Sequence, residues 1–216
     1  FTRFDWVYDL QTSFRSKVYF YFIPIYKRPF WNGISKGCSH FHGNENRTKL
    51  HTIDRQREQL EIAGVKRFPV ASFAWLKSNI DIFKLPRTYA LLIPGGSRLR
   101  EKKRWPSGKY KDLSMRLLHM KITPVLIGTK EEEEVLNDIA KISNQIFNLV
   151  SKTSLLDIAE LARHSKLCVG NDTGPMHLVV KCAKKSIKKV VFDGEDSDPK
   201  LCAPRGEGVI IMYKKN

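Results

Sequence analysis

The stretch KLCVGNDTGPMHLVVKCA, residues 166–183, decides the fold of this chain. A short apolar run ends in Gly-Asn-Asp-Thr-Gly-Pro, and a second apolar run follows at once. The first run predicts a β-strand over 166–171, and the second predicts an α-helix that begins at the Gly-Pro pair. Asp172 or Thr173 can cap this helix, and the proline suits its first turn. A strand that turns directly into a helix is typical of the units that build parallel sheets.

The same alternation continues on both sides of this stretch. Apolar runs that end in polar or glycine-containing turns predict further strands at residues 88–95, 123–129, 146–150 and 188–194. The segments between them predict helices at 107–120, 131–143 and 154–165. Strands and helices that alternate at this spacing predict an α/β fold with a doubly wound, Rossmann-like parallel sheet.

The N-terminal part of the chain is less regular. Residues 6–10 predict a strand, and Thr12 or Ser13 can cap a helix after it. The aromatic and β-branched run at 18–25 predicts a second strand, because such residues favour strands.

An amphipathic helix is expected over residues 52–65, with Ile53, Leu60 and Ile62 facing inward and Gly64 ending it. The mixed, proline-containing residues 66–87 have the composition of a linker. We therefore expect two domains, a partial N-terminal α/β domain over 1–85 and a C-terminal domain over 86–216.

The composition indicates an anionic partner. Lys and Arg number 38 against 22 Asp and Glu, which gives a formal net charge of +16. This balance favours nucleic acid, phosphorylated substrates or an anionic membrane surface, and a generally basic composition without such a partner is the alternative. The four cysteines are widely spaced and form no CxxC pair, which argues against a metal site and favours reduced thiols in the cytosol.

Three loops should converge, because ligands of doubly wound sheets bind beyond the carboxyl ends of the strands. The first loop, PGGSRLREKKRWP at residues 94–106, offers two glycines for close backbone approach, the Ser97 hydroxyl and several cations, among them Lys103. This mixture near a helix start favours phosphate binding, although neither a Walker A motif nor GxGxxG is present. A solvated basic loop is the alternative.

The second and third loops add a carboxylate and an imidazole. In IGTKEEEE, residues 127–134, a glutamate just past a strand end could bind ribose hydroxyls, or it could only stabilise a helix N-terminus. In the third loop, the free amides of the helix after Asp172 and Thr173 form an anion site, and His177 lies on the same first turn. A capped helix that carries a histidine by chance is the alternative there.

These stretches resemble the heptosyltransferase family, glycosyltransferase family nine. The segments that carry the resemblance are GNDTGPMHLVV at 170–180, LIPGGSRLREKKRWP at 92–106, SLLDIAELARHSKLCVGNDTGP at 154–175, DSDPKLCAPRG at 196–206 and DLQTSFRS at 9–16. The resemblance covers most of the chain and is most specific after about residue 89. It implies a GT-B architecture, two Rossmann-like domains around a cleft, with the donor bound by the C-terminal domain and a lipopolysaccharide-core acceptor bound by the N-terminal domain.

The resemblance also implies a reaction and a set of residues. The reaction is inverting, metal-independent transfer of a sugar from an ADP-heptose-like donor, with no cofactor. By matching position, Lys103 would act on the leaving-group phosphate and Ser97 would contact phosphate. Glu132, or its neighbour in the glutamate run, would hold the ribose. The remaining residues around the donor would be Asp172, Thr173, Gly174 and His177.

This sequence departs from the family pattern at the general base. The family's base is an aspartate in a Gly-Asp element after the first strand, and this chain has no such element; Asp5 and Asp9 lie in another context. We therefore expect an N-terminally truncated member with weak or no transfer activity and surviving donor binding.

The expected location is cytoplasmic, with peripheral attachment to the inner membrane face through basic residues of the N-terminal part, namely Arg15, Lys17, Lys27, Arg28 and Lys36. Two alternatives remain. One is a nucleotide-sugar-binding remnant without catalysis. The other is a basic nucleic-acid-binding module, which the absence of an RNP-like pattern, zinc spacing and recognition helix disfavours, so we expect no nucleic-acid partner.

Overall fold

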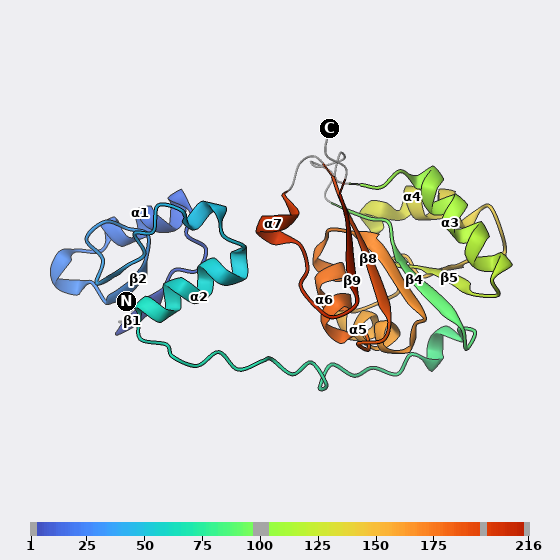
Figure 1. Ribbon diagram of the computed structural model, residues 1–216, viewed down its shortest axis with the longest axis horizontal. Helices are drawn as coiled ribbons and strands as arrows, with labels where there is room; N and C mark the ends of the chain where they lie inside the picture. The colour runs from blue at the N-terminus through green and yellow to red at the C-terminus, as the bar shows by residue number, and fades with distance from the viewer. Residues whose placement is uncertain (1–3, 97–103, 195–197, 214–216) are drawn as a thin grey trace. The chain divides into compact units, whose positions relative to one another are not determined.

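The computed structural model describes residues 4–96, 104–194 and 198–213 (Figure 1). The chain divides into two compact units, both of the predicted α/β class. Unit 1 comprises Phe1–Ala71 with Lys200–Cys202, and unit 2 comprises Ser72–Pro199 with Ala203–Asn216. None of the helices in the described ranges has both the length and the apolar character that a membrane span requires.

Unit 2 is built on a six-stranded, all-parallel sheet with the order β6-β5-β4-β7-β8-β9. The strands are β4 (Tyr89–Ile93), β5 (Thr123–Leu126), β6 (Phe147–Asn148), β7 (Leu167–Asn171), β8 (Lys188–Asp193) and β9 (Val209–Tyr213). Numbered from β4 as the first strand, the order is 3-2-1-4-5-6, which is that of doubly wound dinucleotide-binding domains. The strand order reverses between β4 and β7, so ligands are expected above the carboxyl ends of these two strands.

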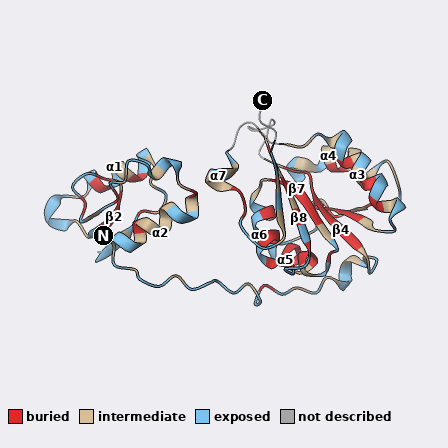
Figure 2. Ribbon diagram, viewed as in Figure 1, coloured by how far each residue is buried: buried red, intermediate tan, exposed pale blue. Residues whose placement is uncertain are grey.

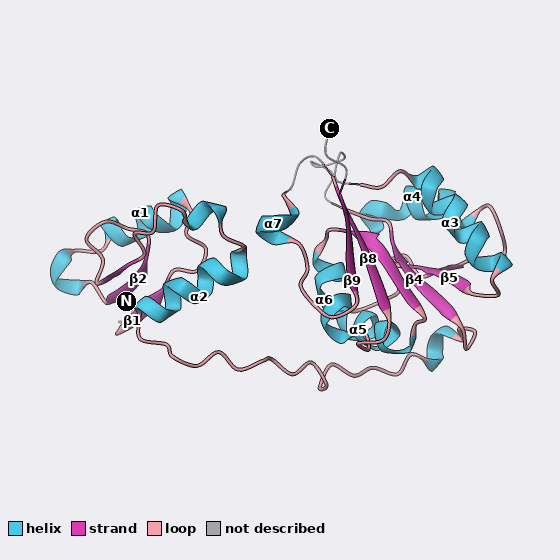
Figure 3. Ribbon diagram, viewed as in Figure 1, coloured by secondary structure: helices cyan, strands magenta, loops and turns pink. Residues whose placement is uncertain are grey.

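Helices cover both faces of this sheet, as Figure 3 shows. They are α3 (Ser107–His119), α4 (Glu133–Ala140), which follows the 3-10 turn η5 (Lys130–Glu132), α5 (Leu155–His164) and α6 (Gly174–Cys182). Successive residues of β4 point to opposite faces, so Leu91 packs in one core cluster with residues of α5 and α6, whereas Leu92 packs with residues of α3 and α4. Every residue of β4 is buried, as Figure 2 shows, which is typical of a central strand in a parallel sheet.

The predicted strands and helices of this region are confirmed, and β9 is an additional strand that the sequence analysis did not predict. Local chemistry explains the confirmed boundaries. Ser154 accepts a hydrogen bond from the amide of Asp157, and the Asp157 carboxylate accepts one from the Ser154 amide at 2.7 Å. This capping box fixes the start of α5.

Residues 72–88 belong to unit 2 by their contacts, although the sequence analysis assigned most of them to a linker and set the domain boundary after residue 85. They contain a single 3-10 turn, η3 (Asp81–Phe83), among the described helical elements. Side chains of α5 hold this segment: the Arg163 guanidinium donates to the carbonyls of Phe73 and Leu76, and Asp157 accepts from the Ser78 hydroxyl.

Unit 1 contains a three-stranded parallel sheet with the order β1-β2-β3. Its elements are β1 (Trp6–Tyr8), α1 (Phe14–Phe22), η1 (Ile25–Lys27), β2 (Phe30–Gly33), β3 (His40–Phe41), η2 (Arg47–Lys49) and α2 (Thr52–Ile62); α7 (Pro199–Cys202) comes later in the chain.

The strand expected at 18–25 is wrong, because most of this run is the second half of helix α1. Ser13 and Ser16 form a capping box at the start of the helix. Ser16 and Phe20, four residues apart on one helical face, are its buried residues, and Phe20 packs edge-on against Trp31 at 5.5 Å. The cap and the helical spacing therefore outweigh the strand preference of the aromatic residues.

The inward face expected for α2 is wrong at Ile53 and Ile62, whereas Leu60 is half-buried. Ile53 and Ile62 are 43% and 42% exposed, whereas Gln59 is buried. The Gln59 amide donates to the carbonyl oxygens of Asp9, at 2.9 Å, and Asn32, at 3.4 Å. The Asp9 carbonyl needs this donor once buried, whereas the Asn32 carbonyl also accepts from the Asp9 amide at 2.8 Å. A polar residue therefore takes the central position of the helix face. The predicted helix end at Gly64, which has a φ of 86°, is confirmed.

Candidate functional site

A cleft of about 550 Å³ opens at the carboxyl edge of the unit 2 sheet. Its walls come from the ends of β4 and β5 and from the first turns of α5 and α6. The lining residues are Ile93, Gly96, Ile127, Gly128, Thr129, Glu131, Glu132, Thr153, Ser154, Leu155, Ile158, Thr173 and Pro175. The described parts of the three loops identified from the sequence thus meet beside the point where the strand order reverses.

Glu132 is the carboxylate at the centre of this cleft. Its Oε2 accepts hydrogen bonds from the Thr129 amide at 2.6 Å and the Thr129 hydroxyl at 2.9 Å, which closes a capping box at η5. A Cβ on Gly95 would lie 2.1 Å from Oε1, and a Cβ on Gly128 would lie 3.1 Å from Oε2. Both glycines therefore make room for the carboxylate, which is held between the ends of two strands.

Asn171, at the end of β7, ties the first loop to the sheet. Its amide nitrogen donates to the carbonyl oxygens of Pro94, at 2.7 Å, and Gly95, at 3.0 Å. Its Oδ1 accepts from the Trp105 amide at 2.9 Å and the Tyr110 hydroxyl at 3.1 Å. Burial raises the pKa of Tyr110 well above its ordinary value, so this hydroxyl stays protonated and donates.

No local pattern in the sequence indicates the role of Asn171, because asparagine is common in turns and its four partners are distant in the sequence. Those partners span both ends of the first loop, so one buried side chain fixes where the loop leaves the sheet and where it returns. Trp105, at the returning end, also stacks on Phe192 with ring centroids 4.1 Å apart.

The start of α6 presents Thr173 and Gly174. Thr173 is the N-cap residue by position, yet its side chain makes no capping hydrogen bond. Thr173 lines the cleft. Its Oγ1 is buried and has no hydrogen-bond partner within the described part of the chain. The first amides of the helix and this hydroxyl are hydrogen-bond donors at the site where an anion would be stabilised by the helix dipole.

Asp172 and His177 form a pair beside this helix start. His177 Nε2 lies 3.2 Å from Asp172 Oδ1, and the Asp172 side chain is only 5% exposed against 48% for His177. Neither residue lines the 550 Å³ cleft, and neither does Gly174. The carboxylate therefore orients an imidazole whose other edge is accessible to solvent.

Two of the predicted site residues, Ser97 and Lys103, lie outside the described residues. Their described neighbours are Gly96 and Arg104, whose Nη2 donates to the Gly96 carbonyl at 2.7 Å. Arg104 Nε is buried without a hydrogen-bond partner among the residues that the structure describes. A Cβ on Gly96 would meet both Arg104, at 3.4 Å, and the Thr173 methyl group, at 3.7 Å. Arg104, one of the cations that the sequence offers in the first loop, is thus the cation of this loop that the described residues place close to the α6 start.

A doubly wound parallel sheet with a cleft at its switch point is the architecture of nucleotide-binding Rossmann-like domains. The chain belongs to Glycosyltransferase family 9 (heptosyltransferase), whose family model matches residues 2–188. No curated protein sequence gives a significant match to the chain.

Solved structures of heptosyltransferases share the fold, which confirms the expected GT-B-like class. E. coli ADP-heptose lps heptosyltransferase II is 21% identical, with a TM-score of 0.72 over 97% of this chain and 68% of that one. The family 9 glycosyl transferase from Veillonella parvula DSM 2008 is 18% identical, with a TM-score of 0.78 over 100% and 64%. E. coli heptosyltransferase WaaC with ADP is 20% identical, with a TM-score of 0.66 over 99% and 68%. The chain thus spans about two thirds of the length of these structures.

Proposed function

We propose that the 550 Å³ cleft of unit 2 binds a nucleotide-sugar of the ADP-heptose type. In this proposal the protein transfers the sugar to a lipopolysaccharide-core acceptor. The transfer inverts the configuration of the sugar and needs no metal ion. The observation that carries the proposal is the fixed Glu132 carboxylate beside the open N-terminus of α6, both at the switch point of the sheet. Structures of E. coli heptosyltransferase WaaC, which has the same fold, were solved with ADP and with ADP-2-deoxy-2-fluoro heptose. These ligands support an ADP-sugar as the proposed donor of this chain.

In this proposal Glu132 accepts hydrogen bonds from the ribose hydroxyls, because a carboxylate past a strand end is suited to a vicinal diol. We propose that the Thr173 hydroxyl and the first amides of α6 bind the diphosphate, and that Ser97 and Lys103 contribute further phosphate contacts. As the glycosidic bond breaks, negative charge grows on the leaving nucleoside diphosphate. Donors already aimed at this charge lower the barrier without a metal ion.

The space in which a Cβ of Gly174 would lie is open, with nothing within 4 Å. We propose that the donor approaches the helix backbone there. The Asp172–His177 pair contributes an oriented imidazole next to the same turn. We propose that His177 contacts the sugar or its phosphate through the edge that Asp172 does not occupy.

Inversion also requires a base that removes the acceptor proton. Asp9 follows strand β1, but its Oδ1 accepts a hydrogen bond from the Thr12 amide at 3.0 Å and the residue is buried. Asp9 thus stabilises the turn after β1 through Oδ1, and its Oδ2 is buried without a hydrogen-bond partner among the described residues. The burial of this carboxylate favours a second candidate function, in which the chain binds the donor and transfers sugar slowly or not at all.

The acceptor side is proposed to lie in unit 1 and to meet an anionic glycolipid at the cytoplasmic membrane face. Of the five basic residues considered for this contact, Arg28 already has a structural role. Its Nε donates to the Ile23 carbonyl at 2.9 Å, and its guanidinium lies 4.4 Å from the centroid of the Phe20 ring. Arg15, Lys17, Lys27 and Lys36 remain the candidates for the acceptor.

Calorimetry with ADP, an ADP-sugar and a UDP-sugar tests the donor site. We expect ADP and the ADP-sugar to bind, and Glu132→Gln to weaken ADP roughly 10- to 100-fold, the loss of about 1.5–3 kcal/mol for hydrogen bonds to a charged group. The matched control is Glu134→Gln, the same change on the exposed surface of α4. Absence of binding to all three nucleotides would overturn the proposal, and binding without sugar transfer would establish the second candidate.

A further inference from the structure

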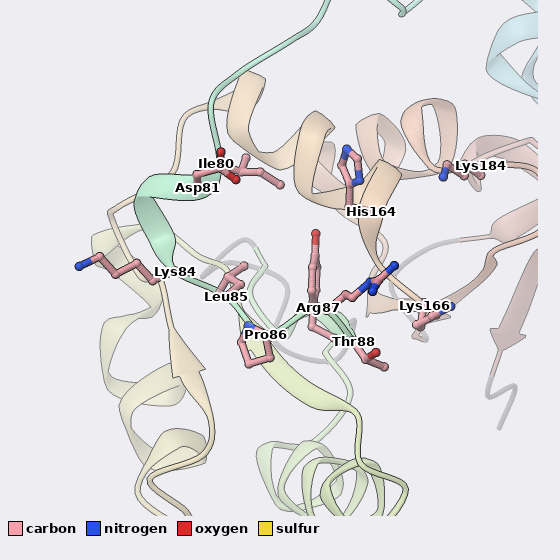
Figure 4. Close-up of a pocket in the computed structure, with 11 residues that line it drawn as sticks. Ile80, Asp81, Lys84, Leu85, Pro86, Arg87, Thr88, His164, Lys166 and Lys184 are labelled. Carbon is pink, nitrogen blue, oxygen red and sulfur yellow. The ribbon is translucent and has the colours of Figure 1, made fainter.

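A second cavity of about 540 Å³ lies at the opposite end of strand β4, where the chain enters the sheet (Figure 4). A smaller pocket of about 360 Å³ adjoins it and shares His164, Lys166 and Lys184 with it. We call the two together the amino-edge groove. It does not include any residue of the cleft around Glu132.

The amino-edge groove carries an excess of positive charge. Arg87, Lys166, Lys184 and Lys84 line it, against one carboxylate, Asp81. Figure 4 shows Lys84 pointing away from Arg87 and Lys166. The four cationic side chains make no ion pair or hydrogen bond with the described residues. Unpaired like charges around one concavity repel each other and raise the local concentration of anions.

The backbone from which these cations project is held firmly. The Lys166 amide donates to the Tyr89 carbonyl at 2.8 Å, and the Tyr89 hydroxyl donates to the Leu161 carbonyl at 2.8 Å. The Lys184 carbonyl accepts from the buried ammonium group of Lys189 at 3.0 Å. The attachment points of the cations are therefore fixed by the sheet and its turns.

We propose that the amino-edge groove binds a soluble ligand that carries two or more phosphate groups. The guanidinium of Arg87 matches a phosphate bidentately, and Lys166 and Lys184 supply point charges along the shared wall of the two pockets. Thr88 lines the same cavity and offers a hydroxyl. The amino-edge groove is separate from the donor cleft, and its proposed ligand does not depend on the function proposed for that cleft.

The acidic residues around the groove favour a small ligand over an extended polyanion. Asp81 lines the larger cavity but not the smaller pocket, and Glu160, which lines neither, pairs with Arg163 at 2.6 Å and His164 at 3.0 Å. An extended membrane surface or nucleic-acid strand would place negative charge beside Asp81 as well as beside the cations. A compact ligand can instead bind at the wall that His164, Lys166 and Lys184 form between the two pockets.

The test is an NMR titration of the whole chain with inorganic pyrophosphate at physiological ionic strength. We expect saturable amide shifts at Thr88, Lys166 and Ser186. The variant R87Q/K166Q/K184Q should lose at least roughly tenfold in affinity, because it removes three charge-assisted contacts to phosphate. The control R116Q/K121Q/K141Q removes the same charges from exposed positions on the α3–α4 side. It should bind as the unaltered chain does.

Several outcomes overturn the inference. Shifts confined to Gly96 and Thr173 would locate pyrophosphate in the donor cleft, and equal weakening in both variants would indicate unspecific attraction to the net charge. Binding of phosphatidylglycerol vesicles or DNA through Arg87, Lys166 and Lys184, without saturable pyrophosphate binding, would assign the surface to another class of partner. Thermal melts establish that both variants are folded, and ADP calorimetry reports on the donor cleft independently.

Discussion

At the scale of single residues, a few side chains determine the geometry of the carboxyl edge. Asn171 uses all its hydrogen-bonding capacity, two donors toward the carbonyls of Pro94 and Gly95 and two acceptor positions toward Trp105 and Tyr110. It sits at the switch point, so any change there acts on β4, β7 and α3 together. Glu132 depends in the same way on the two glycines that leave space for it.

Replacing Asn171 by Asp should destabilise unit 2. The new carboxylate would turn an oxygen toward two carbonyl oxygens that now accept hydrogen bonds, and we expect the free energy of unfolding to fall by at least about 2 kcal/mol. Urea denaturation followed by fluorescence measures this. Asn144→Asp makes the same chemical change at an exposed position and should alter stability little; equal effects of the two substitutions would contradict the role assigned to Asn171.

Gly95→Ala should weaken ADP binding while the chain remains folded. The added Cβ would lie 2.1 Å from Glu132 Oε1, so the carboxylate must move out of its position. Gly108→Ala in α3, where a Cβ meets nothing within 4 Å, is the control. It should stabilise the helix by up to about 1 kcal/mol and leave ADP affinity unchanged. Unaltered ADP affinity in the Gly95 variant would show that Glu132 does not hold the nucleotide.

At the scale of elements, local signals predicted most of unit 2. Strands β4 and β7 are short apolar runs that end in turn residues, and α5 begins at a serine with an aspartate three positions on. Each of these signals lies within a few neighbouring residues. The position of the site was also predictable, because the carboxyl ends of parallel strands lie at one edge of the sheet and the loops that follow them meet there. Its detail was not, since the partners of Asn171 are 61 to 77 residues away.

The wrong predictions in unit 1 also result from contacts between residues that are distant in the sequence. The aromatic run in α1 has strand propensity by residue type, but Ser13, Ser16 and the packing of Phe20 on Trp31 make it helical. On α2, the position of Gln59 follows from carbonyls at strand ends that are 27 and 50 residues distant. No local pattern contains this information.

The capping box of α5 predicts a dependence of stability on pH. Burial raises the pKa of Asp157, but hydrogen bonds from Ser78 and Ser154 outweigh it and lower the pKa below the ordinary value. A lowered folded-state pKa contributes stability above the unfolded value of about 3.9, and this contribution is lost as the pH falls below it. The unfolding free energy of the unaltered chain should therefore decrease between about pH 4 and pH 2 more steeply than that of Asp157→Asn. Parallel pH profiles would contradict this assignment.

At the scale of the whole molecule, the two units differ in how they are stabilised. Unit 2 has two large apolar clusters, one on each face of its sheet. The main apolar cluster of unit 1 has three buried members, Phe20, Trp31 and Cys38, and several of its buried side chains are polar, among them Asn32, His42 and Gln59. Burial of apolar surface dominates stability, so unit 1 should be the weaker unit.

Hydrogen exchange followed by mass spectrometry measures this difference. Amides of β4 and β7 should exchange slowest, at rates set by global unfolding, whereas amides of β1, β2 and α2 should exchange through opening of unit 1. Addition of ADP should protect unit 2 near the α6 start. Equal protection of the two sheets in the absence of ligand would show that the units unfold as one.

The clamp made by Asn171 has a consequence for how the first loop can vary. Because the Asn171 side chain holds Gly95 at one end and Trp105 at the other, its hydrogen bonds close the chain between them into a ring. Doubling the length of such a ring costs only about 0.6 kcal/mol of closure entropy. Insertions between Gly95 and Trp105 should therefore be tolerated, while the Asn171 hydrogen bonds keep both ends of the ring in place.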